Sequence, residues 1–513
     1  MLLSDTVTYH ARSRPDDIAL IFQGVEITYA ELVERLHRLA NAMLELAAPG
    51  DRVAILSENR PEYIDCYYGV PRAGMGLCFI NFRLAPREIV RIINDAEPTV
   101  LITEGPYLEL VHGIRGELTT VKHVVVAGGG AGPDDLDYDA LVAAAPLEPP
   151  ADLPDPDDLA WLIYTSGTTG MPKGAMLSHR NLLAAVNNSA VTWEREPHEI
   201  ALSPWPLCHV SGYLFPFLHV LGNTVVLMRA YDPEEYLALI ERHGCTQSSG
   251  APTMLNMLLQ HPKFDQYDLS SLKRIGYGAA AMPAEVIRTA MDKLPGVRFI
   301  TGFGMTELSG NIFYMSPDQH LAALDGDDQS TLTSVGRLMP LAMARVVDDD
   351  MNDVAVEQVG ELVVQGDQVL TGYWRRPEAN EEAFAGGWFH SGDLAKWDAA
   401  GNLYIVDRKK DMIITGGENV YSREVEEVLY THGAVAEAAV IGLPDPMWGE
   451  KIVAVIQTRP GMVVEPEELI ELCRSQLASF KKPKHVVFVD ELPRNAAGKI
   501  LKRELRDQVK TDV

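Results

Sequence analysis

The chain has 513 residues, too many for one compact hydrophobic core, so two or more domains are expected. Hydrophobic residues at 47% and charged residues at 23% are typical of an ordinary soluble globular protein. With 44 Lys and Arg residues against 72 Asp and Glu residues, the net charge is −28. This argues against nucleic acid as a main partner, because no basic surplus is available to meet phosphates.

The first 150 residues predict alternating helices and strands. Thr28 followed by Glu31 is a capping box, and leucine and methionine side chains recur behind it at helical spacing. Residues 52–59, 98–104 and 122–128 each contain an apolar run with the length of a buried strand. This alternation favours layered α/β structure.

The segment 200–228 contains no charged residue and is long enough to span a bilayer. Prolines, glycines and histidines interrupt it, however, and such interruptions are typical of a buried loop, helix and strand. We therefore expect no integral membrane segment. The start of the chain, MLLSDTVTYHARSRPDD, lacks a basic stretch followed by an apolar core, so no signal peptide is expected either.

The five cysteines are scattered and form no CxxC pair, which indicates buried free thiols in a reducing compartment, the cytoplasm.

Further local signals mark the middle of the chain. Ser178 is expected to cap a helix that runs to Trp193, and Gly244 to close a helix that begins near Asp232. Residues 334–404 contain short β-like runs and predict a small barrel or sheet. From Asp407 the pattern changes to a charged knot, a Gly-Gly turn and a helix. We place the boundary there, with domains 1–408 and 409–513.

One motif, WLIYTSGTTGMPKGAML at 161–177, has the features of a phosphate cradle. A strand leads into a turn rich in glycines and hydroxyls, and a lysine follows, so backbone N–H groups and a positive charge can converge on an anion. It is no Walker A loop, because Pro172 and Gly174 stand where that pattern needs Gly and Ser or Thr. The spacing alone leaves a polar surface turn open. The candidate residues are Thr165, Ser166, Gly167, Thr168, Thr169, Gly170 and Lys173.

The whole string YTSGTTGMPKG resembles the phosphate-loop signature of the adenylate-forming superfamily, which includes acyl-CoA synthetases. Further motifs follow in the order that the superfamily uses: PLCHVSG at 206–212, YGAAAMP at 277–283, TGFGMTE at 301–307, GWFHSGDLA at 387–395, DRKKDMIITGGENVYSREVE at 407–426 and PRNAAGKI at 493–500. The resemblance covers essentially the whole chain. It implies a large N-terminal domain of layered α/β sheets with a small β-barrel, and a small mobile α+β C-terminal domain that carries a catalytic lysine.

The resemblance also implies the reaction. A carboxylate attacks the α-phosphate of ATP and releases pyrophosphate, and the thiol of coenzyme A then displaces AMP. The first step brings an anion against a polyanion, so catalysis must consist mostly of positioning and charge neutralisation. By resemblance, Lys499 bridges the carboxylate and the α-phosphate, Glu307 holds Mg²⁺, and Thr306 touches the α-phosphate.

The remaining nucleotide positions also follow from the resemblance. Phe303 offers a stacking surface for adenine where many members have Tyr, and Ala279 replaces the second glycine of the usual GGA. Asp393 accepts the ribose hydroxyls, Arg408 reaches the ribose and phosphates, and Lys410 is the hinge. The other backbone positions near the nucleotide are Gly278, Ala280, Gly302, Gly304 and Met305. For coenzyme A, the candidates are Gly416, Gly417, Glu418, Trp448 and Lys482.

The acyl pocket is expected around PLCHVSG, with walls from His209, Val210, Ser211, Gly212, Gly250 and Ala279. No acidic residue lies between Ile200 and Met228, and a buried ammonium without a partner would be costly, so amino acids are disfavoured as substrates. The apolar neighbours of these residues indicate an apolar carboxylic acid. Fatty, aryl and alicyclic acids, including steroid-derived ones, remain open.

Three alternatives remain beside a carboxylate–CoA ligase. The enzyme could load a carrier-protein thiol in place of coenzyme A, or the chain could be a non-enzymatic nucleotide-binding relative; Lys499, Glu307, Asp393 and Arg408 argue against the latter. A luciferase-type oxygenase is disfavoured, since the chain ends in KTDV and carries no peroxisomal SKL address. A homodimer is one open assembly state. Because Lys499 and the TGGEN loop both follow the hinge, we hypothesise that each serves one half-reaction in its own domain orientation.

Overall fold

The computed structural model describes residues 1–165, 172–193, 196, 199–280, 282, 284–325, 330–416, 418–494 and 499–509. The chain divides into two compact units: one comprises Met1–Met343 and Val364–Phe389, and the other Ala344–Val363 and His390–Val513. The expected boundary at residue 408 falls inside the second unit. The predicted boundary marks the hinge of a moving domain, and a single conformation does not test a hinge, so the boundary stays a prediction.

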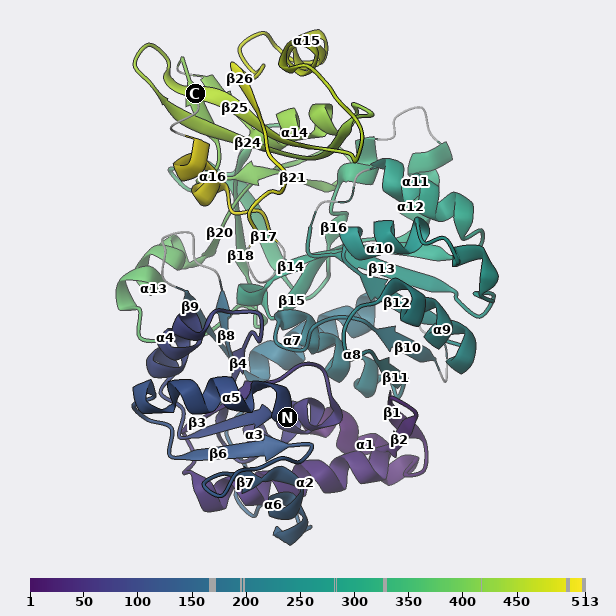
Figure 1. Ribbon diagram of the computed structural model, residues 1–513, viewed down its shortest axis with the longest axis vertical. Coiled ribbons are helices and arrows are strands. Elements are labelled where there is room, and N and C mark those ends of the chain that lie inside the picture. Colours follow the sequence, from purple (N-terminus) through teal and green to yellow (C-terminus); the bar gives the residue numbers. More distant parts are fainter. Residues whose placement is uncertain are drawn as a thin grey trace. The chain divides into compact units, whose positions relative to one another are not determined.

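The first unit contains an eight-stranded sheet whose central strands are parallel (Figure 1). Helices alternate with these strands, in agreement with the predicted layered α/β structure. Only the last two strands at one edge, β9 and β19, pair antiparallel to their neighbours. In spatial order the strands are β19 (Gly372–Tyr373), β9 (Lys173–Ser178), β8 (Leu159–Thr165), β4 (Gly76–Ile80), β3 (Arg52–Leu56), β5 (Val100–Glu104), β6 (His123–Ala127) and β7 (Leu136–Asp137).

A second, nine-stranded sheet completes the first unit. Its six inner strands from β14 to β1 are parallel, and antiparallel strands close both edges. The spatial order is β16 (Arg337–Leu338), β15 (Gly310–Met315), β14 (Arg298–Met305), β13 (Arg274–Gly278), β12 (Gln247–Gly250), β10 (Ile200–Ser203), β11 (Thr224–Leu227), β1 (Ile18–Phe22) and β2 (Val25–Thr28).

Helices connect and cover these strands, as parallel pairing requires. The α-helices of this unit are α1 (Asp5–Ser13), α2 (Tyr29–Leu46), α3 (Pro61–Arg72), α4 (Pro86–Ala96), α5 (Gly105–Ile114), α6 (Tyr138–Ala144), α7 (His179–Thr192), α8 (Leu214–Val220), α9 (Pro233–His243), α10 (Pro252–Leu259), α11 (Ala284–Lys293), α12 (Pro317–Asp325) and α13 (Pro377–Ala383). Short 3₁₀ turns are η1 (Arg115–Glu117), η2 (Val210–Tyr213), η3 (Phe264–Gln266), η4 (Thr306–Leu308), η5 (Ser330–Thr333) and η6 (Ala385–Gly387).

Local sequence signals set several helix ends. Thr28 accepts from the Glu31 N–H and the Glu31 side chain accepts from the Thr28 N–H, so the predicted capping box is confirmed. Ser178 caps α7, which ends at Thr192 with Trp193 as its C-cap residue. Gly244 ends α9 with φ +59, a left-handed conformation that glycine adopts at little cost.

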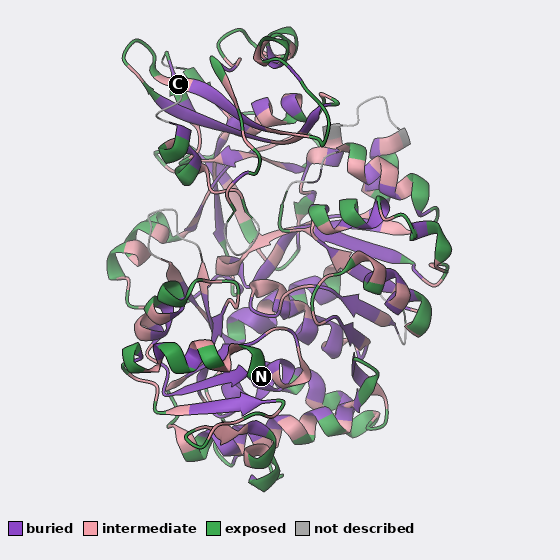
Figure 2. Ribbon diagram, viewed as in Figure 1, coloured by how far each residue is buried: buried purple, intermediate pink, exposed green. Residues whose placement is uncertain are grey.

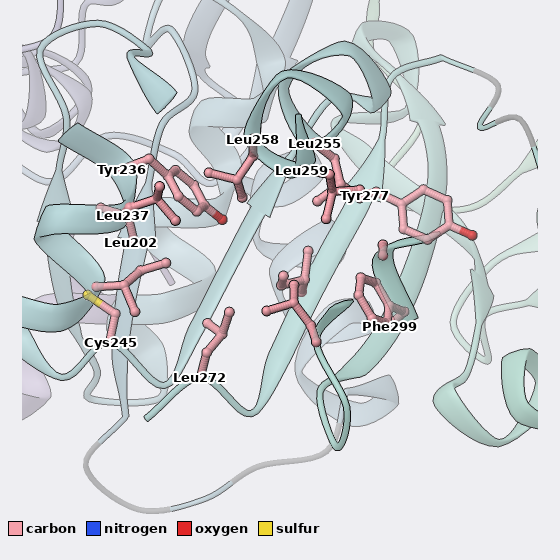
Figure 3. Close-up of a cluster of buried hydrophobic side chains, with 14 of the residues drawn as sticks. Leu202, Tyr236, Leu237, Cys245, Leu255, Leu258, Leu259, Leu272, Tyr277 and Phe299 are labelled. Carbon is pink, nitrogen blue, oxygen red and sulfur yellow. The ribbon is translucent and has the colours of Figure 1, made fainter. Parts of the chain in front are cut away.

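Figure 3 shows how the second sheet is stabilised on one face. Leu255 and Leu258 of α10 and Leu237 of α9 pack with Tyr277 of β13 and Phe299 of β14 in one buried cluster. Figure 2 shows that the inner strands of both sheets are mostly buried, while the outer faces of the helices are exposed. The burial of both sheet faces explains why these strands appear as continuous apolar runs in the sequence.

The uncharged segment 200–228 forms β10, η2, α8 and β11, in agreement with the expected loop, helix and strand. Within the described part of the chain, none of the helices combines the length and the apolar character that a membrane crossing needs. All five cysteines are buried and carry free thiols, as predicted.

Three buried histidines, His179, His219 and His320, are expected to reduce the stability in mild acid. Burial lowers the pKa of each imidazole from 6.5 to about 4. Between these values the unfolded chain binds more protons than the folded one. The free energy of unfolding therefore falls as the pH drops from 6.5 to 4, by about 4 kcal/mol per pH unit for the three groups together.

Calorimetric Tm values between pH 7.5 and 5 measure this effect. His320 Nδ1 contacts the Ser316 carbonyl at 2.8 Å, and its Nε2 lies 2.8 Å from the Tyr277 hydroxyl. His320→Gln keeps polar contacts at the site but cannot gain a proton, so it should reduce the contribution of these histidines by about one third. An equally steep loss of Tm in this variant would contradict the assignment.

The second unit contains a four-stranded sheet and a larger sheet covered by helices. The first matches the small barrel or sheet expected from residues 334–404. Its order is β17 (Met343–Val347), β18 (Gly360–Gln365), β20 (Phe389–Trp397) and β21 (Leu403–Arg408). The other has β23 (Glu418–Val420), β22 (Ile413–Thr415), β25 (Gly449–Thr458) and β24 (Val435–Asp445), with β26 (His485–Phe488) beside β25; its helices are α14 (Ser422–Tyr430), α15 (Pro466–Gln476) and α16 (Lys502–Val509).

Alternate side chains of β24 and β25 point to opposite faces of the larger sheet. Val440 and Ile452 pack on one face with Leu429 of α14 and Leu469 of α15. Ile441 and Val453 pack on the other face with Leu505 of α16. Both layers of this core are built from residues between Ile413 and Val509 of the second unit.

Candidate active site

The predicted phosphate loop joins two paired strands. Thr165 at the end of β8 lies opposite Lys173 at the start of β9, and the Thr165 hydroxyl donates to the Lys173 carbonyl at 3.4 Å. The Lys173 ammonium lies 5.0 Å from the centroid of the Tyr373 ring. The structure therefore fixes both ends of the loop. The predicted residues between them, Ser166, Gly167, Thr168, Thr169 and Gly170, lie outside the described residues.

The predicted metal ligand lies at the turn between β14 and β15. Thr306 and Glu307 belong to η4, which joins these antiparallel strands, and both are half-buried. The Tyr373 hydroxyl donates to Glu307 Oε1 at 3.1 Å, and the Leu370 N–H donates to the Glu307 carbonyl at 2.8 Å. Because Lys173 contacts the same tyrosine, the end of the phosphate loop and the acidic turn meet at Tyr373.

The donor set at this turn is suited to Mg²⁺ that arrives with a nucleotide. Glu307 Oε2 accepts no hydrogen bond from any residue that the structure describes. Among all the residues that the structure describes, no cluster of three or more His, Cys, Asp or Glu side chains could enclose a metal. Mg²⁺ is commonly bound through one or two carboxylates together with substrate phosphates. Glu307 with the phosphate oxygens of ATP would provide such a site.

Glycines allow β13, β14 and β15 to approach closely beside this turn. A Cβ at Gly278 would lie 2.5 Å from the Gly302 carbonyl oxygen. A Cβ at Gly302 would overlap the Asn311 amide, and one at Gly304 would overlap the Gly310 carbonyl. These glycines are therefore required by strand packing, whatever they also do for a nucleotide.

The next predicted positions flank the same strands. Ala279 has φ +67, a left-handed conformation that costs an alanine about 1 kcal/mol, so the substitution at the usual second glycine stores some strain. Ala279 and Ala280 are exposed, and Met305 is half-buried. Phe303 is half-buried, with its ring 6.0 Å from that of Phe313 at an interplanar angle of 62°.

In the second unit the predicted ribose ligands form an ion pair. Asp393 on β20 and Arg408 on β21 are cross-strand partners, with 2.9 Å between Arg408 Nε and Asp393 Oδ1. The Asp393 side chain is only 3% exposed and that of Arg408 is 41% exposed. Arg408 also donates to the Ser391 carbonyl at 3.2 Å. The pair thus consists of the buried Asp393 carboxylate and the partly exposed Arg408 guanidinium.

The predicted hinge and catalytic lysines are electrostatic neighbours in this unit. Burial lowers the pKa of Lys410; Asp411 opposes this shift, and the cations Arg408, Arg506 and Lys499 reinforce it. Lys499 is exposed, and the pairing of Arg494 with Ile500 closes the short loop on which it lies.

Several predicted coenzyme A residues gather around Trp448. The Gly416 N–H donates to the Trp448 carbonyl at 2.7 Å, and a Cβ on Gly416 would lie 2.9 Å from the indole. Glu418 is exposed on the adjacent strand β23, and Gly417 lies outside the described residues. The ammonium over the indole, at 5.3 Å, belongs to Lys484. The sequence indicated Lys482, which is half-buried, two residues earlier in the KKPK run.

The predicted acyl-pocket residues occupy η2 and the end of β12. His209 is the N-cap residue of η2, which contains Val210, Ser211 and Gly212. A Cβ on Gly212 would overlap the buried Tyr67 phenol, so core packing is sufficient to explain this glycine. At Gly250, by contrast, a Cβ would make ordinary contacts with Met254 at 3.5 Å.

Trp193 is a neighbouring residue whose contacts the sequence did not reveal. A Cβ on Gly276 of β13 would lie 3.3 Å from the edge of the Trp193 indole. The indole also packs against Phe217 and Tyr314, with ring centroids 5.5 and 5.9 Å away. The sequence contained no signal for this aromatic group, because its members come from three distant segments: the C-cap of α7, helix α8 and strand β15.

The sequence matches a known family. Residues 7–374, well over half of the chain, match the model described as AMP-binding enzyme. The chain belongs to the AMP-binding enzyme family. Residues 424–499 match the companion model, the AMP-binding enzyme C-terminal domain. The resemblance inferred from the motifs is thereby confirmed, together with the mixed α/β class of a large and a small part.

Curated relatives of this AMP-binding enzyme include a feruloyl-CoA synthase from Amycolatopsis sp, 39% identical over 97% of this chain and 96% of the relative. A long-chain-fatty-acid–CoA ligase from Bacillus subtilis (strain 168) is 34% identical over 99% and 94%. Among solved structures, an anthranilate CoA ligase in complex with anthranoyl-AMP has a TM-score of 0.90 and 27% identity, over 100% of this chain and 98% of that chain.

This AMP-binding enzyme is thus an AMP-forming carboxylate–CoA ligase that uses ATP, Mg²⁺ and coenzyme A. Its two half-reactions place different demands on the residues described above. Acyl-adenylate formation needs cations near the phosphates, and thioester formation needs a path for the thiol. Lys173, Glu307 and Tyr373 meet in the first unit, whereas Asp393, Arg408, Lys410 and Lys499 lie in the second.

Proposed function

We propose that the enzyme activates an aromatic or arylalkanoic carboxylic acid and transfers its acyl group to coenzyme A. The observation that carries this proposal is the contact of the Trp193 indole with Gly276. Gly276 pairs with Ser249, the residue before the predicted pocket residue Gly250. Phe217 and Tyr314 both pack against the indole and extend the aromatic surface. Ring faces and edges of this kind favour a flat aromatic partner.

The relatives support the same class of substrate. The names feruloyl-CoA synthase and anthranilate CoA ligase both refer to aromatic acids. A long-chain fatty acid is the second candidate, favoured by the name of the Bacillus subtilis relative. The two candidates differ in shape, since a planar ring suits a slot between aromatic side chains and an alkyl chain needs a long tunnel.

Trp193→Ala is expected to change the substrate preference. Removing the indole loses stacking and apolar contact worth about 1–2 kcal/mol, so kcat/KM for arylalkanoic acids should fall about 10-fold relative to octanoate. The measurement is coenzyme A-dependent AMP formation across a panel of alkyl, cinnamic, benzoic and steroid-derived acids. Trp193→Phe, which keeps a ring, is the matched control and should retain the aryl preference. Equal losses for alkyl and aryl acids in Trp193→Ala would contradict the aromatic pocket.

We further propose the roles of the charged residues. Lys173, Glu307 and Thr306 would bind the phosphates of ATP and the Mg²⁺ that shields the phosphate charge. Asp393 and Arg408 would bind the ribose. Lys499 would bridge the substrate carboxylate and the α-phosphate. Lys499 and the Gly416 loop would act in different orientations of residues 409–513, with Lys410 as the hinge. In support of an anion site here, the charge of Lys499 contributes to the lowered pKa of Lys410, so an anion bound near both lysines would relieve their repulsion.

Location and assembly complete the proposal. Five buried free thiols support a reducing compartment such as the cytoplasm. Light scattering of the purified enzyme distinguishes a monomer from the homodimer that remained open in the sequence. Pyrophosphate release with coenzyme A, compared with carrier protein, identifies the preferred thiol.

A further inference from the structure

We propose that Tyr373 is a positioning residue that holds the Glu307 carboxylate in the orientation that binds Mg²⁺ and connects it to Lys173 of the phosphate loop. The inference rests on the proposed role of Glu307 as the metal ligand. It assigns a function to a residue that the sequence motifs did not indicate.

The contacts of Tyr373 carry the inference. Its hydroxyl donates to Glu307 Oε1 at 3.1 Å, and the Lys173 ammonium lies 5.0 Å from its ring centroid. One side chain therefore touches a predicted metal ligand through its polar end and a predicted phosphate ligand through its ring. A cation near the ring draws electron density from it and makes the hydroxyl a better donor to the carboxylate.

Tyr373 is itself held firmly. Its backbone pairs with Ala175 of β9, two residues beyond Lys173. The Tyr373 N–H donates to Asn380 Oδ1 at 2.6 Å, and Asn380 Nδ2 donates back to the Tyr373 carbonyl at 3.1 Å. The residue is only 8% exposed. The phenol thus has a fixed base from which to orient Glu307.

The hydroxyl occupies one carboxylate oxygen of Glu307 and leaves Oε2 for a metal. Without this donor, the half-buried side chain of Glu307 could rotate, and its free rotamers would have to be ordered each time Mg²⁺ binds. Residues that orient a metal ligand in this way commonly change metal affinity by about 10- to 100-fold when they are substituted.

Tyr373→Phe tests the proposal, because it keeps the ring and its cation contact and removes only the hydroxyl. The readout is Mn²⁺ binding to the enzyme complexed with α,β-methylene-ATP, followed by electron paramagnetic resonance. We expect about 10-fold weaker Mn²⁺ binding, unchanged binding of the nucleotide without metal, and an unchanged Tm. The Mg²⁺ concentration for half-maximal adenylation should rise by a similar factor.

The chain offers a matched control. Tyr404 donates to Asp398 Oδ2 at 3.3 Å and has the Lys396 ammonium 5.8 Å from its ring, the same combination of contacts away from the predicted ligands. Tyr404→Phe should bind Mn²⁺ as the unmodified enzyme does. Asn380→Ala is a second variant that loosens Tyr373 without touching its hydroxyl. Asn380→Ala should weaken Mn²⁺ binding by a smaller factor than Tyr373→Phe does.

Glu307→Gln separates failure of the inference from failure of the proposed metal site. If Glu307→Gln loses Mn²⁺ binding and Tyr373→Phe does not, Tyr373 does not position the ligand and the inference is wrong. If Glu307→Gln binds Mn²⁺ normally, the metal site itself is assigned wrongly and the inference falls with it. Equal losses in Tyr373→Phe and Tyr404→Phe would also overturn it.

Discussion

Lys499→Ala is expected to lower the rate of acyl-adenylate formation by about 10²–10³-fold or more, by analogy with the loss of a donor to a developing oxyanion. The step joins a carboxylate to a polyphosphate, and a mobile ammonium with three donors can contact oxygens of both. Lys499 is exposed on a short loop closed by Arg494 and Ile500, so its removal should leave the fold intact.

The same variant supplied with ready-made acyl-adenylate and coenzyme A should form thioester at an almost unchanged rate. This split follows if Lys499 serves only the adenylation orientation. Arg503→Ala removes an exposed cation from the same end of the chain and is the matched control, with both half-reactions retained. If thioester formation also collapses in folded Lys499→Ala, the assignment of the two half-reactions to two orientations is wrong.

Asp393→Asn is expected to raise the KM for ATP by about 10²-fold. An ionised carboxylate can accept from both ribose hydroxyls, each bond to a charged acceptor being worth about 1.5–3 kcal/mol, and an amide offers only one oxygen. Arg408 loses its ionic partner in this variant, but it keeps the Ser391 carbonyl, and its guanidinium is 41% exposed and can be hydrated, so folding should survive.

The comparison of ATP with 2′,3′-dideoxy-ATP isolates the ribose contact. The unmodified enzyme should favour ATP strongly, and Asp393→Asn should lose most of this preference. Glu361→Gln is the control: Glu361 pairs with Lys409 and His390 in the same sheet and has no proposed contact with the nucleotide. An Asp393→Asn enzyme that still favours ATP as strongly would show that Asp393 does not bind the ribose.

Local signals in the sequence were sufficient for much of the fold. The capping residues Thr28 and Ser178 and the terminal Gly244 act within one turn of the backbone, so their neighbours in sequence determine the helix ends. The apolar runs at 52–59, 98–104 and 122–128 indicated buried strands, because a strand covered on both faces has apolar side chains throughout. The order of strands within each sheet depends on long-range pairing and could not be obtained in this way.

The residues of the candidate site also differ in whether a local motif or a long-range contact reveals them. Glu307, Asp393 and Lys499 lie in motifs of consecutive residues and were identified from them. Tyr373 and Trp193 depend on side chains from distant segments, namely Lys173 and Glu307 for the tyrosine and Phe217 and Tyr314 for the tryptophan. Gly212 shows the converse: its missing side chain is explained by Tyr67 in the core, which no local pattern reveals.

The most direct test of the account is the exchange of labelled pyrophosphate into ATP without coenzyme A. Exchange measures reversible acyl-adenylate formation. This is the step that Lys173, Lys499 and Mg²⁺ are proposed to promote. The account predicts exchange that requires both Mg²⁺ and an aromatic carboxylic acid and that disappears in Lys499→Ala. Nucleotide binding with no acid-dependent exchange across the whole acid panel, or exchange that persists in Lys499→Ala, would contradict it.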